Sequence, residues 1–100
     1  MPRSRTVSFG LGAVVATPGA LAALEALGLA PIDYLRRYAK GDWGELCEED
    51  KKANAEALAT GARLMSAYAL PDGAKLWIIT EAEDERGNRA ATTLLLPEEY

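Results

Sequence analysis

The chain has 100 residues, of which 49% are apolar and 26% are charged, a composition typical of one small globular domain. It has one cysteine and no histidine, which excludes a disulfide scaffold and leaves no Cys/His ligand set for a structural metal ion. The net charge of −4 is unevenly distributed: residues 1–40 carry five basic and two acidic side chains, whereas residues 41–100 carry six basic and 13 acidic ones. An acidic second half disfavours binding to a nucleic-acid backbone and favours contact with a basic protein surface.

The N-terminal residues indicate the cellular compartment of the protein. Residues 1–6 form a basic stretch that we expect to be the flexible tail of a single domain spanning residues 1–100. The apolar run that follows, Val7–Ala16, is too short and too interrupted by glycine for a signal peptide or a membrane span. We therefore expect a cytoplasmic protein without membrane contact.

A strand and a helix are predicted in the first 30 residues. Ser8–Ala16 has the apolar composition of a strand, although two glycines weaken it. Thr17 followed by Pro18 is a favourable helix start, because the threonine hydroxyl caps the first turn and proline at the first helical position loses no hydrogen bond. We expect this helix to end at Gly28. Its buried face should consist of Leu21, Leu24 and Leu27.

Two further helices are predicted in the middle of the chain. The first covers Pro31–Ala39, and its buried face should consist of Ile32, Leu35 and Ala39. Acidic residues in the first turn favour the second helix over Glu48–Thr60, with Gly61 as its stop and a stabilising pair between Glu48 and Lys52. This helix is polar and should lie on the surface, with burial restricted to Ala53, Ala57 and Leu58.

The last forty residues change to the two-residue period of strands. Arg63–Leu70 and Lys75–Glu81 alternate on either side of a Pro-Asp-Gly turn at residues 71–73, which predicts a β-hairpin. After an acidic loop, Arg89–Leu96 should form a third antiparallel strand that Pro97 stops. We therefore expect an α+β fold of about three helices packed on a three- or four-stranded antiparallel sheet.

Both faces of this sheet carry apolar side chains. Those expected on one face are Leu76, Ile78, Leu94 and Leu96, and those on the other are Met65, Trp77, Ile79 and Leu95. Helices can cover one face, so the second needs another cover: a further helix, a second copy of the chain or a target protein.

The residue types argue against catalysis. Without histidine, the Ser-His-Asp and Cys-His arrangements cannot form, and Cys47 has no base beside it in sequence. Gly10 and Gly12 match only the first two glycines of a dinucleotide-binding fingerprint, and Val15 stands where the third belongs. We therefore expect a protein that is not an enzyme and that takes no cofactor and no metal.

Two acidic segments are the candidate surface for binding a protein partner. Trp43, in a glycine-flanked turn beside the first segment, could serve as an exposed aromatic anchor, although a core position is the ordinary role of tryptophan. The candidate residues are Trp43, Glu45, Glu48, Glu49, Asp50, Glu81, Glu83, Asp84 and Glu85. The alternative is that these carboxylates are only the solvated charges of a helix start and a hairpin loop, which keep the protein soluble and bind no partner.

A basic and aromatic cluster supports a hypothesis of a different class, a regulator that binds nucleic acid. Phosphate contacts and base stacking would come from Tyr34, Arg36, Arg37, Tyr38 and Lys40. The net negative charge and the lack of a helix-turn-helix pattern count against it, so nucleic acid is the less favoured partner.

Segments along nearly the whole chain carry a family resemblance. They are Ala16–Ala20, Pro31–Leu35, Gly41–Leu46, Glu49–Asn54, Gly61–Tyr68, Leu76–Ala82 and Thr92–Tyr100. On these segments the chain resembles a family of small bacterial proteins that are encoded on plasmids and integrative mobile elements and labelled plasmid-related or restriction-associated. It departs from that family in a longer loop at Glu83–Asn88 and in Cys47, where a better helix cap is common.

The resemblance implies a mobile-element setting and transfers no catalytic residues. Small acidic proteins in that setting often act against host defence, as antirestriction or anti-CRISPR factors that cover the basic surface of a nuclease. The sequence therefore predicts a non-enzymatic, protein-binding accessory factor of a mobile genetic element.

Overall fold

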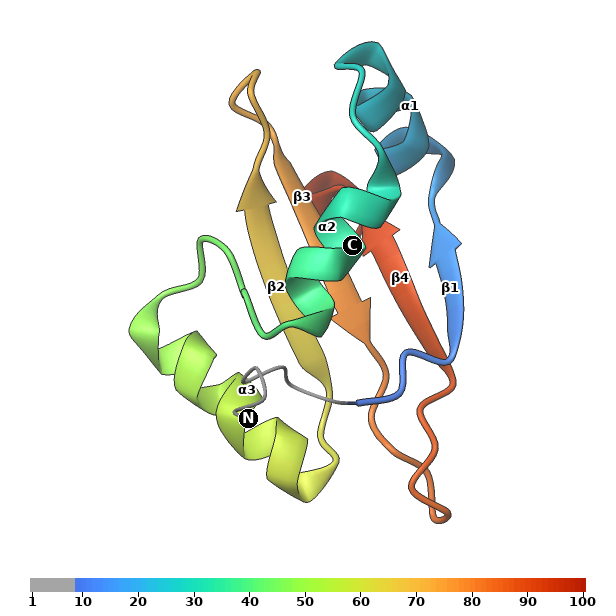
Figure 1. Cartoon of the computed structure of the whole chain (residues 1–100), viewed down its shortest axis with the longest axis vertical. Helices are drawn as coiled ribbons and strands as arrows, with labels where there is room; N and C mark the ends of the chain where they lie inside the picture. The colour runs from blue at the N-terminus through green and yellow to red at the C-terminus, as the bar shows by residue number, and fades with distance from the viewer. Residues whose placement is uncertain (1–8) are drawn as a thin grey trace, which may run out of the picture.

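A computed structural model describes residues 9–100 of the chain, so the expected flexible tail, residues 1–6, lies outside the described residues. The elements follow one another along the chain as shown in Figure 1. They are β1 (Ala13–Ala16), α1 (Pro18–Ala26), α2 (Pro31–Ala39), α3 (Glu48–Thr60), β2 (Leu64–Ala69), β3 (Lys75–Thr80), β4 (Ala91–Leu95) and a terminal 3-10 turn, η1 (Pro97–Glu99). The α+β fold class is confirmed, and no helix within residues 9–100 has the length and apolar character needed to cross a membrane.

The sheet has four strands in the order β1-β4-β3-β2. The β2–β3 hairpin and the β3–β4 pair are antiparallel, as predicted, but β1 lies parallel to β4, so the expectation of a wholly antiparallel sheet is wrong. The reason is the path of the chain. After β1, helices α1 and α2 carry it back across the sheet, and β2 then starts in the same direction as β1 at the opposite edge (Figure 1).

β1 is shorter than the predicted strand and begins only at Ala13. Gly12, just before it, has φ +64° and lies so close to the backbone of Arg89 and Ala90 that an added Cβ would clash with it. Glycine is needed there because only a residue without a side chain allows this approach in a left-handed conformation. The chain therefore reaches the sheet through a turn and extends only after it.

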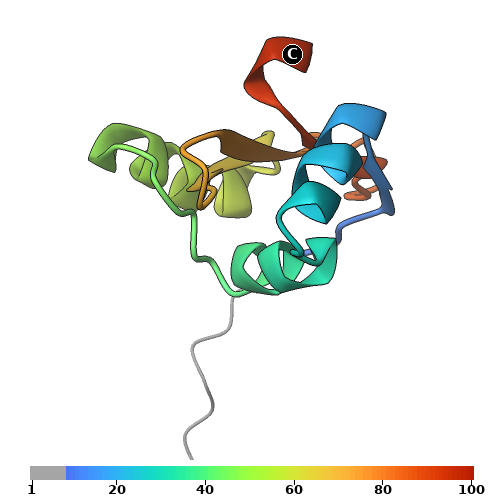
Figure 2. The ribbon, with the colours of Figure 1, turned by 90° about the horizontal axis from the view of Figure 1, so that it is seen from above.

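Helix α2 covers one face of the sheet, helix α1 lies beyond the ends of β1 and β4, and the C-terminal turn lies on the side of the sheet opposite α2 (Figures 1 and 2). The core lies between these helices and the sheet, where Leu24 and Tyr38 pack with fully buried side chains from the strands. These strand residues are Leu64, Tyr68, Leu76, Ile78 and Leu94. Burial of such side chains contributes about 1.5–3 kcal/mol each to stability.

The buried face of α2 differs from the predicted one. Tyr34 and Tyr38 are buried, whereas Ile32 is 50% exposed and Leu35 is only partly buried. Two tyrosines one helical turn apart bury more apolar area than the aliphatic set, and the Tyr38 hydroxyl finds a partner inside, at 2.7 Å from Oγ1 of Thr80. The face expected for α1 is also partly wrong, since Leu24 is buried but Leu21 is 47% exposed.

Helix α3 has the predicted bounds and ends where Gly61 adopts φ +84°. It lies beside the edge of the sheet at β2, and its buried residues are Asn54 and Ala57, not the predicted Ala53. Asn54 is buried because its side-chain amide donates to the carbonyl of Met65 at 2.6 Å and accepts from the Met65 N–H at 3.2 Å. The predicted pair with Lys52 is replaced by a contact of 3.8 Å between Glu48 and Lys51.

The second face of the sheet receives part of its cover from the chain itself. The ring of Tyr100, after η1, packs edge-on against Trp77 with centroids 5.6 Å apart. The Tyr100 hydroxyl accepts a hydrogen bond of 2.9 Å from Arg63. Ile79 and Leu95 on this face are buried. The cover that the sequence required on this side is therefore supplied in part by the C-terminal turn (Figure 2).

Candidate functional site

The eight candidate carboxylates all lie on the surface, and they occupy two places joined by α3. One group lies at and before the first turn of α3, and the other lies in the loop between β3 and β4. All are exposed: Glu45, Glu48, Glu49, Asp50, Glu81, Glu83, Asp84 and Glu85. We call these eight residues the acidic surface.

Helix α3 sets the spacing of the acidic surface. With 13 residues it is about 20 Å long. Its acidic first turn lies at one end, and the β3–β4 loop lies beside the other end (Figure 1). Carboxylates in a first helical turn are stabilised by the unpaired N–H groups and the positive end of the helix dipole. Cys47 occupies the N-cap without a side-chain hydrogen bond, so these acidic residues are the favourable electrostatic feature of this helix end.

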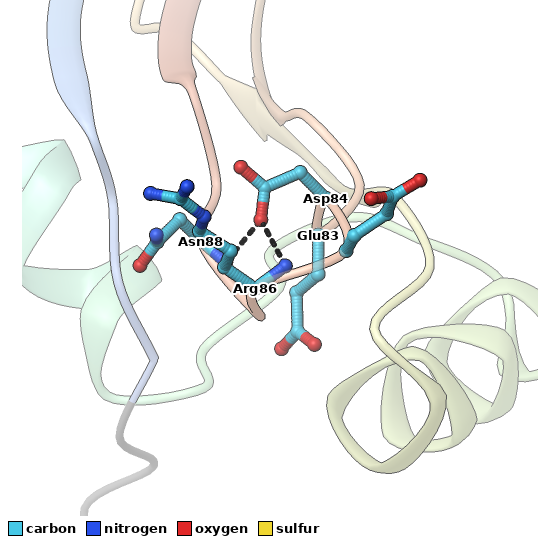
Figure 3. Close-up of a pocket in the computed structure, with 5 residues that line it drawn as sticks. Glu83, Asp84, Arg86 and Asn88 are labelled. Atoms are coloured by element: carbon cyan, nitrogen blue, oxygen red, sulfur yellow. Dashed lines mark hydrogen bonds between the residues drawn. The ribbon is translucent and has the colours of Figure 1, made fainter.

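The β3–β4 loop is ordered by one of its own carboxylates. Oδ1 of Asp84 accepts hydrogen bonds from the backbone N–H groups of Arg86 at 2.8 Å and Asn88 at 2.9 Å, as Figure 3 shows. These bonds lower the pKa of the Asp84 carboxyl group. The loop therefore presents its charges from a defined conformation.

A backbone contact ties this loop to the end of α3. The N–H of Glu83 donates to the carbonyl of Gly61 at 2.7 Å, and an added Cβ at Gly61 would clash with the Glu83 side chain. Glu83 Oε2 lies 3.8 Å from Nη2 of Arg89. The loop and the helix end are therefore held together by both backbone and side-chain contacts.

Arg89 is the residue that sequence reasoning missed. Its side chain is only 2% exposed, and its guanidinium donates to the carbonyls of Ala62 at 2.8 Å, Glu81 at 3.0 Å and Ala57 at 3.3 Å. These carbonyls belong to the end of α3, to the segment that follows it and to the residue after β3. A cation is favourable at the C-terminal end of a helix. Arg89 therefore ties the β3–β4 loop to the end of α3, the helix whose first turn carries the other group of carboxylates.

Trp43 does not fit the predicted role of an exposed anchor. It is 9% exposed and belongs to the core cluster, with its ring centroid 5.6 Å from that of Tyr38 and 6.3 Å from that of Phe9. Its large apolar ring is buried under the helix layer, so the surface position expected for it is wrong.

The basic and aromatic cluster does not form the predicted patch either. Tyr34 and Tyr38 are buried and cannot stack with bases. Nε of Arg37 donates to Asp42 at 2.7 Å, which lowers the pKa of that carboxyl, and the guanidinium lies 4.7 Å from the Tyr68 ring centroid. Of the five residues, Arg36 and Lys40 are exposed and without such contacts in the described part of the chain.

Hydroxyl groups form a buried chain beneath the helices. Tyr38 and Thr80 are hydrogen-bonded at 2.7 Å, Thr80 and Thr92 at 2.8 Å, and Thr92 donates to the carbonyl of Leu11 at 2.7 Å. Burial raises the pKa of Tyr38 to about 12, so its phenol keeps its proton at neutral pH. The chain is a structural network that pairs polar groups inside the core.

Neither metal sites nor relatives give a further indication of function. Within residues 9–100, no group of three or more Cys, Asp or Glu side chains is arranged to hold a metal ion. Comparisons with protein-family models, with curated proteins and with solved structures give no match for this chain.

Proposed function

We propose that this protein is a non-enzymatic accessory factor that binds another protein through the acidic surface. The observation that supports the proposal best is the exposure of all eight carboxylates on a support fixed by buried contacts, of which Arg89 and Asn54 provide the principal ones. A preorganised charged surface loses less side-chain and loop entropy on binding than a mobile one. Solubility alone does not require such anchoring.

The partner is a protein with a basic surface. Opposite charges across an interface steer association and fix its register. Proteins that bind nucleic acid carry such basic surfaces, and a nuclease of host defence belongs to this class. The mobile-element setting of this proposal rests on the family resemblance described above. The acidic surface would then cover the positions where phosphates bind and prevent access by nucleic acid.

The test is capture of partners from a bacterial lysate, identified by mass spectrometry, with three forms of the tagged protein. The first is the native chain, and the second reverses the charge at the start of α3 in the triple variant Glu48→Lys, Glu49→Lys, Asp50→Lys. The third is a matched control, Glu25→Lys, Asp33→Lys, Glu98→Lys, which changes the net charge by the same amount at exposed positions elsewhere.

The expected result is a partner that the native and control proteins retain and the α3 variant loses. Retention of that partner should also fall as salt is raised, because surface charges are screened beyond about 8 Å at physiological ionic strength. Equal capture by all three proteins would contradict the proposal. If the captured protein is a nuclease, its DNA cleavage should be inhibited by the native chain and not by the α3 variant.

A further inference from the structure

The two edges of the sheet differ in a way that bears on self-association. At the β2 edge, the N–H of Ala67 donates to the carbonyl of Trp43 at 3.3 Å, and the Ala67 carbonyl accepts from the N–H of Glu45 at 2.6 Å. The backbone of Met65 on the same edge is bonded by the Asn54 amide. The chain therefore closes this edge with its own groups, a common protection against pairing with other strands.

The β1 edge is open in the described part of the chain. The N–H of Ala13 donates to Ala90 and that of Thr17 to Leu94, each at 3.0 Å, so alternate residues of the strand face β4. The backbone groups of Val14 and Ala16 point the other way, because bonding direction alternates along a strand in a parallel ladder. Within residues 9–100, no backbone group bonds to them from that side.

The side chains at this edge are also exposed. Val14 is 46% exposed and Val15 is 48% exposed, and the two point to opposite faces of the sheet. They are two of the five large apolar residues that the described structure leaves exposed. The edge thus offers unpaired backbone groups together with apolar side chains on both faces.

We propose that the open edge of β1 pairs antiparallel with β1 of a second copy of this chain, which joins the two four-stranded sheets into one. Pairing about a two-fold axis at this strand would bond Val14 and Ala16 of each copy across the interface. The proposal is independent of the acidic surface, because α3 lies along β2 at the far edge of the sheet (Figure 1).

The charge distribution favours a second copy at this edge. The protein carries a net charge of −4, so two copies repel each other over most of their surfaces. Residues 9–24, which include β1 and most of α1, carry no charged side chain. Antiparallel pairing also places the acidic β3–β4 loops of the two copies at opposite ends of the joined sheet, since this loop lies near the start of β1 (Figure 1).

The closed β2 edge determines the form of the assembly. Growth into a fibre requires two different edges that pair head to tail, whereas a single open edge permits only the pairing of identical strands about a two-fold axis. Because β2 is occupied at Met65 and Ala67, self-pairing through β1 ends at the dimer. A four-residue strand is only about 13 Å long, so we expect a weak dimer that forms at high protein concentration.

The test is sedimentation equilibrium of the native chain up to about 1 mM, a range chosen because the paired strand is smaller than the roughly 800 Å² per partner of a standard interface. The mass should rise from the monomer value of 10.7 kDa toward twice that value. Val14→Pro removes only the outward N–H, so it should keep β1 paired with β4 and abolish the dimer. Val14→Thr, which keeps the N–H and the branched side chain, should dimerise like the native chain.

A second pair of variants keeps the test decisive if proline disturbs the fold. Val14→Lys and Val14→Glu should each weaken association about tenfold or more, because the two like charges lie diagonally across the strand pair on the same face of the joined sheet. An equimolar mixture of the two should associate again, since opposite charges then face each other. A native chain that stays at 10.7 kDa at all concentrations would overturn the proposal, as would a Val14→Pro variant that is folded and dimerises like the native chain.

Discussion

The guanidinium of Arg89 donates to the main-chain carbonyl of Ala57 at 3.3 Å and so joins the segment before β4 to the last turn of α3. Arg89 is almost fully buried, and it makes two further bonds to main-chain carbonyls. A buried cation is stable only when its donors are paired, and here the partners are mainly backbone dipoles and not a carboxylate.

Replacement of Arg89 should therefore be costly. We expect Arg89→Ala to lower the free energy of unfolding by about 3 kcal/mol, because three main-chain carbonyls, one of them buried and two part-buried, lose their donor. Urea denaturation followed by circular dichroism measures this change. The control is Arg86→Ala in the exposed loop, which should change stability by less than about 0.5 kcal/mol. Similar effects of the two substitutions would show that Arg89 is not the support described above.

Asn54 provides the second support, at the β2 edge. Asn54→Ala removes both bonds to Met65 and should lower the free energy of unfolding by about 2 kcal/mol. The amide hydrogen of Met65 should also exchange faster with solvent, whereas Lys52→Ala on the exposed side of α3 should leave that exchange rate unchanged. Unchanged protection of Met65 in Asn54→Ala would contradict the role given to this side chain.

Two buried hydroxyl groups, those of Ser66 and Thr80, differ in their hydrogen bonding, and their removal should therefore affect stability differently. Ser66 Oγ is buried without a hydrogen-bond partner in the described structure, whereas Thr80 Oγ1 bonds to both Tyr38 and Thr92. Ser66→Ala should leave stability unchanged or raise it slightly, because no bond is lost. Thr80→Val should lower it by about 1–3 kcal/mol, because two partners lose their bond. Thermal denaturation of both variants distinguishes the two cases, and equal losses would contradict the network.

Stability should decrease in acid through Glu99. Its carboxylate accepts hydrogen bonds from the Thr17 hydroxyl at 2.5 Å and the Leu96 N–H at 2.9 Å, which lower its pKa from the ordinary value of 4.5. A lowered folded-state pKa stabilises the fold above pH 4.5 and loses that effect as the pH falls below it.

The variant Glu99→Gln should therefore reduce the fall in melting temperature between pH 6 and pH 3, a range of about 1.5 units on either side of the ordinary pKa of 4.5. Glu98→Gln, at the neighbouring exposed residue, should behave like the native chain. If both variants follow the native pH curve, the contact between Glu99 and the start of α1 does not contribute to stability.

Local signals allowed much of the fold to be predicted. Thr17 and Pro18 define the start of α1, Gly61 defines the end of α3, and the Pro-Asp-Gly turn defines the β2–β3 hairpin. Each of these signals acts within a few residues through backbone geometry and capping. They are readable without knowledge of the tertiary structure.

What could not be predicted depends on partners distant in sequence. The parallel placement of β1 and the burial of Tyr34 in place of Ile32 are set by packing between elements. Arginine and asparagine usually lie on the surface. Arg89 and Asn54 are buried here because their side chains form hydrogen bonds with main-chain groups that are distant in sequence. The carboxylates of the acidic surface were predictable because an exposed charge needs no partner, but their common support was not.

Binding through the acidic surface is measured by titrating the chain with the partner captured from the lysate, after that partner has been purified. Calorimetry should compare the native chain, the triple lysine variant at Glu48, Glu49 and Asp50, and the control at Glu25, Asp33 and Glu98. Kd should rise by about tenfold or more in the first variant and by less than about threefold in the control. Equal increases in the two variants would contradict it, because net charge and not the acidic surface would then govern binding.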